Sequence, residues 1–258
     1  MTEIVWALLL GIVEGLTEYL PVSSTGHLLL VSRLIGQQST AFVIVIQLGA
    51  ILAVLAEYRA RFTRWDPNLF VALAIGFVPT AVAGLLLRKL IKEHLTGPAP
   101  IAWALIVGGV LMIIVERIRK TRKITGESGI EKVTPKRALA IGIGQCFSLW
   151  PGASRSMCTI VAGQLTGLST ATAAEFSFLL GLPTLGAATV YEGWKSRAEL
   201  FASSGSTLAL AVGLVTSFVV AWVVVRVFIR YLKSHGLEPF GIYRIVLGVV
   251  VLGAITHG

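Results

Sequence analysis

The sequence predicts an all-α integral membrane protein with six transmembrane helices and two re-entrant helical hairpins, arranged as an inverted-topology repeat. Three observations predict this fold. The chain is 55% hydrophobic and 14% charged, whereas soluble domains carry about 25% charged residues. Six windows are apolar over the length of a membrane span. Two further hydrophobic stretches are interrupted near their middles by proline and polar residues.

Six windows are expected to cross the membrane, since about 20 mostly apolar helical residues cover a hydrocarbon core of about 30 Å. The connection from Arg117 to Arg137 is the richest in Lys and Arg. The positive-inside bias therefore places it in the cytoplasm and both chain termini outside, although Arg88 and its basic neighbours oppose this bias. The net charge of +9 is spread between spans instead of forming one patch, so no nucleic-acid partner is expected. The six windows are 41–57, 69–87, 101–115, 171–191, 208–225 and 240–255.

The two interrupted stretches, 4–35 and 138–168, are each expected to form helix, break and helix. Proline disfavours helix in the residue before it, and serine is a preferred N-cap for the helix that follows. Broken backbone at membrane depth is tolerated only where protein or a water-filled cavity satisfies its polar groups. Both stretches are therefore predicted to be re-entrant hairpins. The first should stop near Leu20-Pro21 and restart around Ser23-Ser24, and the second should stop near Trp150-Pro151-Gly152 and restart around Ser154.

The chain reads as two copies of one unit. Placing Pro21 over Pro151 superposes "PVSSTGH" on "PGASRSM". A hairpin followed by three spans makes the second copy enter the membrane from the opposite side. The halves are 1–125 and 126–258, which together form one membrane domain. Interrupted helices in matching places of inverted repeats indicate a site near the midplane, at the repeat interface.

The first break carries acids, hydroxyls and an imidazole. Glu14 and Glu18 are four residues apart, so both carboxylates project from one helix face. Such a pair would hold a divalent cation, Mg²⁺ or Ca²⁺, or a proton. His27 follows Ser23 by four residues and Ser24 by three. On a restarted helix its imidazole is expected to lie over their hydroxyls.

The second break carries a cation. Both restarted helices would direct free N–H groups and positive dipole ends into the breaks, which suits an anion. Arg155 adds a planar fork that fits phosphate oxygens. Acidic pair, imidazole, hydroxyls and arginine together predict phosphoryl chemistry. Capping explains each serine or threonine singly at least as well as catalysis does, and Glu175 is left between a first-turn acid and an outer partner of the site. The hydroxyl residues in question are Ser23, Thr25, Ser154 and Ser156, and Thr159 shares a helix face with Arg155.

The motifs "EGLTE", "PVSSTGH" and "PGASRSMCT", with the run "EFSFLLGLPTLGA", closely resemble those of the BacA-type undecaprenyl-diphosphate phosphatases, a family associated with bacitracin resistance. The resemblance covers essentially the whole chain. It implies removal of the terminal phosphate from a C55 polyprenyl diphosphate, which regenerates the lipid carrier for peptidoglycan and other cell-wall polymers. It also implies a bacterial plasma (inner) membrane location, with the site open to the outer, periplasmic face.

The predicted roles follow from combining the resemblance with the chemistry of the residues. Arg155, the half-helix N-termini and the hydroxyl residues would bind the diphosphate. Glu14 and Glu18 would position the divalent cation, or one of them would act as an acid. Ser24 would attack phosphorus or orient the attacking water, with His27 as general base. The substrate would be a polyprenyl diphosphate lipid in the bilayer, and a homodimer is left open. The alternative is an inverted-repeat transporter or flippase for an anionic lipid or phosphate.

Overall fold

The chain folds entirely from helices within the described ranges. The computed structural model describes residues 2–35, 40–64, 66–201 and 204–256. Apart from one isolated parallel bridge between Glu127 and Leu168, these ranges contain no β pairing. The elements are α1 (Thr2–Thr17), α2 (Ser24–Ile35), α3 (Thr40–Glu57), α4 (Arg59–Thr63), α5 (Pro67–His94), α6 (Pro98–Thr121), η1 (Ile130–Lys132), α7 (Pro135–Cys146), η2 (Phe147–Leu149), α8 (Arg155–Leu165), α9 (Thr170–Lys195), α10 (Arg197–Leu200), α11 (Ser204–Leu232) and α12 (Glu238–Thr256).

Long apolar helices confirm an all-α, multi-pass membrane protein. In the described ranges, α5, α6, α9, α11 and α12 are long and apolar enough to cross a membrane, while the apolar stretch Ala41–Glu57 of α3 is shorter. Each of the six windows expected to span thus falls in a helix. The number of crossings and the re-entrant layout remain predictions.

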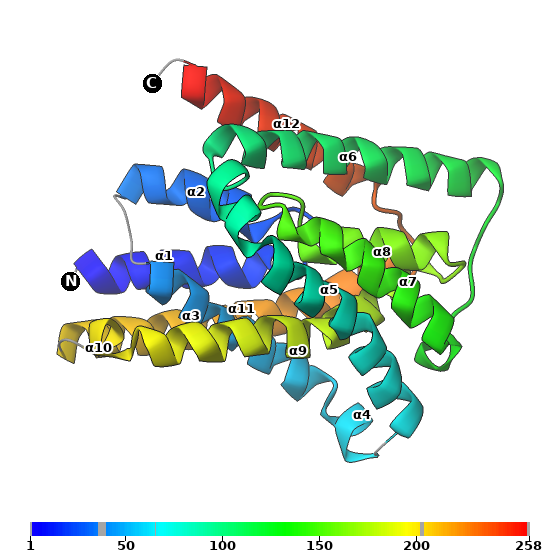
Figure 1. Ribbon diagram of the computed structural model, residues 1–258, viewed down its shortest axis with the longest axis horizontal. Helices are drawn as coiled ribbons and strands as arrows, with labels where there is room; N and C mark the ends of the chain where they lie inside the picture. Colours follow the sequence, from blue (N-terminus) through cyan, green and yellow to red (C-terminus); the bar gives the residue numbers. More distant parts are fainter. Residues whose placement is uncertain (1, 36–39, 65, 202–203, 257–258) are drawn as a thin grey trace.

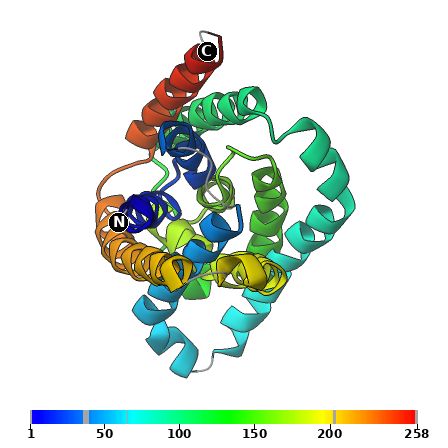
Figure 2. The ribbon, with the colours of Figure 1, turned by 90° about the vertical axis from the view of Figure 1, so that its left-hand side faces the viewer.

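The long helices surround α7 and α8. Seen end-on, α7 and α8 lie toward the centre, with α5, α6, α9, α11 and α12 outside them (Figure 2). The first turn of α1 and the last turn of α12 lie at one end of the molecule, and the α6–α7 connection lies at the other (Figure 1). The pair α1 and α2 occupies the first end, whereas α7 and α8 extend toward the second. The two interrupted segments therefore meet near the middle.

Both half-helices begin where the sequence predicts them, but the helix before each break ends earlier than expected. Helix α1 ends at Thr17, slightly before the expected stop, and the Thr17 hydroxyl donates to Val13 O at 2.7 Å. Pro21 lies beyond this end and could not extend α1, because it has no N–H to donate. Helix α2 then begins at Ser24. The second break follows the same pattern, with α7 ending at Cys146 and α8 beginning at Arg155.

Glycine permits the close contact between α6 and α12. A Cβ added to Gly109 would lie 2.5 Å from Gly241 O, and one added to Gly241 would lie 2.8 Å from Gly109 O. Small residues let helix backbones approach in membranes, where van der Waals packing replaces the hydrophobic drive between helices. This contact fixes α12 beside α6, and both helices reach the breaks.

The polar connection between the halves, which the positive-inside bias predicts to be cytoplasmic, is partly buried where it begins at the end of α6. Helix α6 continues to Thr121, and both Glu116 and Arg119 are buried. Arg119 donates to Gln164 O at 2.8 Å and to Leu168 O at 3.2 Å. The guanidinium therefore satisfies carbonyls at the end of α8, which explains why this basic residue is not in solvent.

Candidate active site

The two breaks contact each other directly. Ser156 Oγ, at the start of α8, donates to Leu20 O in the first break at 2.9 Å. Arg155 Nη2 lies 3.5 Å from Glu18 Oε1. Since these partners are far apart in sequence, only the fold brings the acid of the first hairpin to the arginine of the second.

Both half-helices follow a serine N-cap that has a positive φ angle. Ser23 and Ser154 have positive φ angles of 70° and 72°, a conformation that L side chains rarely adopt. Ser23 Oγ accepts from Gly26 N at 3.3 Å, and Ser154 Oγ accepts from Met157 N at 3.3 Å. Both serines are thus N-caps. Ser24 and Arg155 are consequently the first residues of their helices.

Glu18 is the centre of the polar contacts. Its Oε2 accepts from Ser24 Oγ at 2.9 Å and from Gln47 Nε2 at 3.0 Å, while its Oε1 faces Arg155. Only 6% of the Glu18 surface is exposed. A carboxylate in this position can accept the proton of the Ser24 hydroxyl, because that hydroxyl already donates to it.

Arg155 is buried, and its donors are only partly used. Nη1 donates to Ser177 O at 2.8 Å, and the guanidinium lies 5.5 Å from the centre of the Tyr19 ring. Arg155 Nε has no partner among the described residues, nor has Glu14 Oε1. Buried polar atoms are normally hydrogen-bonded. Of these two residues, Arg155 lines the polar cavity described below, so its guanidinium is placed to contact a ligand there.

A polar cavity of about 230 Å³ lies between the breaks. Glu14 lies beside Glu18 and Gln47, behind this cavity, and is 1% exposed. The cavity therefore presents an acid and hydroxyls on one side and a cation on the other. Its polar lining includes Glu18, Ser23, Ser24, Thr25, Gln47, Ser154 and Arg155.

Two predicted substrate-binding residues point elsewhere. Ser156 and Thr159 are fully buried and do not line the polar cavity. Thr159 Oγ1 donates to Arg155 O at 2.8 Å and lies 2.6 Å from Ser177 Oγ. The side chain therefore packs behind the arginine, because an (i, i+4) hydroxyl is satisfied by its own helix.

The hydrogen-bond partners of His27 are not the hydroxyls of Ser23 and Ser24 that the spacing predicts. Its Nδ1 lies 2.8 Å from Ser23 O, and its Nε2 lies 2.6 Å from the hydroxyl of Tyr243 on α12. The two rings are stacked, with centroids 5.6 Å apart. His27 does lie one helical turn after Ser23, but the first turn of α2 directs the imidazole toward the Ser23 carbonyl instead of the Ser23 hydroxyl.

Glu175 is also outside the site. Its Oε1 lies 3.1 Å from Arg61 Nη2, in an ion pair at the base of α9. Two interpretations of Glu175 were left open. Its contacts do not support the interpretation that it is an outer partner of the site.

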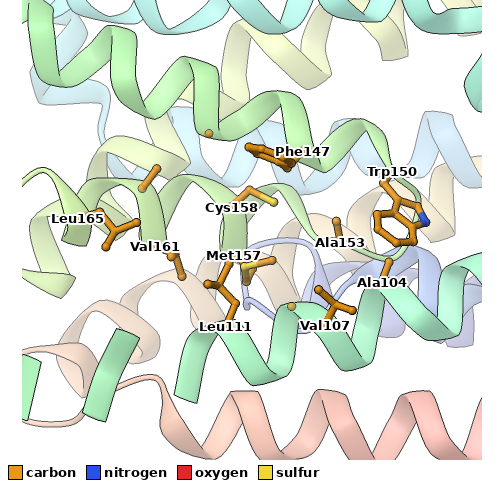
Figure 3. A pocket seen from close by; sticks show the side chains of 13 residues that line it. Ala104, Val107, Leu111, Phe147, Trp150, Ala153, Met157, Cys158, Val161 and Leu165 are labelled. Carbon is orange, nitrogen blue, oxygen red and sulfur yellow. The ribbon is translucent and has the colours of Figure 1, made fainter. Parts of the chain in front are cut away.

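The second break separates polar from apolar space. Ser148, Pro151 and Ser154 line the polar cavity. Phe147, Trp150 and Ala153, from the same segment, line an apolar pocket of about 230 Å³ against α6 (Figure 3). The segment from Phe147 to Arg155 is therefore a wall with a polar and an apolar face.

Comparison with known proteins identifies the family. A family model described as bacitracin resistance protein BacA matches residues 7–250, which include both breaks and α12 up to Val250. The chain belongs to the BacA family. A BacA-family relative from Sorangium cellulosum, named undecaprenyl-diphosphatase, is 59% identical over 95% of this chain and 84% of its own length. Proteins of the same name from Thermoanaerobacter pseudethanolicus and Campylobacter fetus are 46% and 45% identical, over 98% and 95% of this chain and 97% and 96% of their own lengths.

The donor set of this BacA-family site suits a hard divalent cation in part. Glu14, Glu18 and Ser24 offer only oxygen, the ligand type that Mg²⁺ and Ca²⁺ prefer. Glu14 Oε1 has no hydrogen-bond partner among the described residues, although Glu14 does not line the polar cavity. No group of three or more His, Cys, Asp or Glu side chains gathers for a metal within the described ranges. Two carboxylates are therefore the acidic ligands available, with substrate phosphates as further oxygen donors.

Proposed function

We propose that the chain is an undecaprenyl-diphosphatase, which hydrolyses undecaprenyl diphosphate to undecaprenyl phosphate and inorganic phosphate. The relatives named for this activity match it over nearly their full lengths. One structural observation carries the proposal: Ser24, Glu18 and Arg155 meet at a polar cavity between two half-helix N-termini. Transfer of a phosphoryl group needs a nucleophile, a proton acceptor and positive charge in this arrangement.

Arg155 and the two helix N-termini would bind the diphosphate. The first N–H groups of α2 and α8 point into the breaks, and helix N-termini favour anions. Arg155 Nε has no competing partner among the described groups. In a site that excludes water, such donors oppose developing negative charge more strongly than they would in solution. Thr25 and Ser154, which line the cavity, add hydroxyls for the phosphate oxygens.

Ser24 would attack the terminal phosphorus, or orient the water that attacks it. In either case the proton passes to Glu18, which already accepts from the Ser24 hydroxyl at 2.9 Å. The bond between the terminal phosphorus and the bridging oxygen breaks, and undecaprenyl phosphate leaves. If Ser24 attacks, a water molecule would then hydrolyse the phosphoserine, which releases inorganic phosphate and restores the Ser24 hydroxyl. If water attacks, its oxygen becomes part of the inorganic phosphate directly. His27, first expected to be the base, would instead hold the backbone of Ser23.

Glu14 and Glu18 would hold the Mg²⁺ or Ca²⁺ ion that the sequence predicts. When bound, a divalent cation supplies charge neutralisation at the phosphate oxygens. The protein's own contribution is to keep Glu14 buried beside Glu18 and Gln47.

We further propose an inverted repeat in the bacterial plasma membrane, with the site open to the outer face. The matching serine caps of the two breaks support the repeat. The placement of the two hairpins toward opposite ends supports the inversion (Figure 1). The basic α6–α7 connection would lie in the cytoplasm by the positive-inside bias.

Phosphate release from undecaprenyl diphosphate by the purified protein in detergent tests this function. We expect the wild type to release phosphate. In Arg155→Lys the rate of release should fall by at least about 100-fold, because lysine keeps the charge but lacks the planar guanidinium that binds phosphate oxygens in pairs. Arg197→Lys, at an exposed arginine on α10, is the control. Folded wild-type protein that releases no phosphate but moves the lipid across vesicle membranes would replace the phosphatase by the transporter.

A further inference from the structure

A fully buried arginine on α12 lies outside the motifs of the two breaks. Arg244 is 0% exposed. It takes part in none of the ion pairs found among the described residues. Burying a cation without a carboxylate is costly unless hydrogen bonds compensate for the lost water. The partners of Arg244 therefore indicate what the residue is for.

Those partners are four backbone carbonyls. Nε and Nη2 donate to Leu105 O at 3.4 Å and to Ala104 O at 3.1 Å, which anchors the guanidinium on α6. Nη1 donates to Pro21 O at 3.2 Å, and Nη2 donates also to Gly152 O at 3.1 Å. One guanidinium therefore holds a carbonyl of each break.

The two carbonyls occupy equivalent places in the breaks. The matching N-caps are Ser23 and Ser154, so the structural correspondence of the breaks is shifted by one residue from the superposition of Pro21 on Pro151 predicted from the sequence. Pro21 stands three residues before Ser24, and Gly152 stands three residues before Arg155. Ser24 and Arg155 each begin the helix that follows the break. Because the Arg244 guanidinium is rigid and binds both carbonyls, it fixes the distance between the Ser24 hydroxyl and the Arg155 guanidinium.

Gly108 makes room for this fork. A Cβ at Gly108 would lie 2.3 Å from Arg244 Nη2 and 2.9 Å from Met157 Cε. Any side chain there would push the guanidinium away from the break carbonyls. Gly108 thus offers a way to displace the fork while keeping the charge.

We propose that Arg244 is a positioning residue, which sets the two breaks at the separation that the diphosphate requires. This inference rests on the proposed function. Lysine cannot replace it, because a single ammonium on a flexible stem cannot hold carbonyls from three segments in fixed directions.

The test compares Arg244→Lys, Arg244→Met and Gly108→Ala with Arg230→Lys, a control at an exposed arginine of α11. Three quantities are measured for each variant in detergent: the thermal unfolding midpoint, kcat for undecaprenyl diphosphate, and the Kd of inorganic pyrophosphate by calorimetry. Calorimetry gives the affinity of the folded molecules, so a smaller folded fraction does not change the Kd. It also does not depend on turnover.

We expect kcat to fall roughly 100-fold in the three variants, because small misplacements of reacting groups cost about that much. The Kd of pyrophosphate should rise about tenfold, the loss expected for about 1.4 kcal/mol of binding free energy. Arg230→Lys should match the wild type in all three quantities.

Folded variants with unchanged kcat and unchanged Kd would overturn the proposal. Loss of the unfolding transition in all three would overturn it too, since Arg244 would then maintain the fold instead of the site. Wild-type protein that binds pyrophosphate but releases no phosphate from the lipid would contradict the proposed function alone.

Discussion

The carboxylate of Glu18 and the guanidinium of Arg155, 137 positions apart in the sequence, form the ion pair that joins the two interrupted segments, with 3.5 Å between Oε1 and Nη2. Both side chains are buried. A bound diphosphate would take over Arg155 as its counter-ion, which leaves Glu18 with Ser24 and Gln47. In the proposed mechanism, the resting ion pair would keep the cation and the proton acceptor in place before substrate arrives.

Replacing Glu18 by Gln should abolish most of the activity. The amide cannot accept the Ser24 proton, and general-base contributions are worth about 10²- to 10⁴-fold in rate. We expect kcat to fall by at least about 100-fold. Glu175→Gln, which loses only the ion pair with Arg61, is the matched control and should keep near-normal turnover. Equal losses in the two variants would contradict the assigned role of Glu18.

Ser24→Ala should separate activity from stability. The Ser24 hydroxyl donates to Glu18, while capping of α2 is done by Ser23. Turnover should therefore drop by at least about 100-fold, with little change in the unfolding midpoint. If Ser24→Ala keeps normal turnover, both a serine nucleophile and a water-orienting serine are excluded.

Ser154 should behave as a cap in a strained conformation. Ser154→Ala removes the bond to Met157 N and keeps a Cβ at φ 72°. We expect it to lower the free energy of unfolding by about 1 kcal/mol. Ser154→Gly loses the same bond, but glycine adopts positive φ freely. It should therefore be less destabilising than alanine, as measured by denaturant unfolding in detergent. The reverse order would show that the φ angle carries no strain.

His27 should act through the backbone rather than as a base on Ser24. His27→Gln should lower kcat without removing an ionisation from the pH profile of kcat/KM. Tyr243→Phe, which loses the partner of His27 Nε2, should lower kcat in the same direction by a smaller factor. A titration limb present in the wild type and absent only in His27→Gln would restore the base role.

Removal of divalent cations should stop turnover. Chelator should abolish phosphate release, and added Mg²⁺ or Ca²⁺ should restore it. Glu14→Gln should raise the cation concentration needed for half-maximal activity, because one of the two carboxylates is lost. Phosphate release that is indifferent to chelator would contradict a metal at Glu14 and Glu18.

Much of the fold follows from local sequence signals. Apolar length predicts the long helices, and proline followed by serine predicts where α2 and α8 begin. The predicted end of α1 is less accurate, because the helix ends at Thr17 and the chain turns before it reaches Pro21. The burial of the basic end of α6 was not predicted, because Arg119 binds carbonyl groups that lie far from it in the sequence.

The sequence predicts the site residues that lie in the motifs of the two breaks, but not those that lie in the membrane spans. Gln47 and Arg244 each lie in an apolar segment without a motif. A lone polar or charged residue in such a segment is a functional candidate by default, and that signal would have found both. The partner of His27 could not be deduced, because Tyr243 reaches it only through the packing of α12 beside the first break.

The serine-capped turns give the site a direction. Ser24 and Arg155 hold equivalent places, one at the head of each half-helix, yet one offers a hydroxyl and the other a permanent charge. A diphosphate lying between them meets two unlike ends. Under the proposed mechanism, binding in the reversed orientation would put the lipid-linked phosphate at the nucleophile. The difference between Ser24 and Arg155 would then determine which phosphorus is attacked.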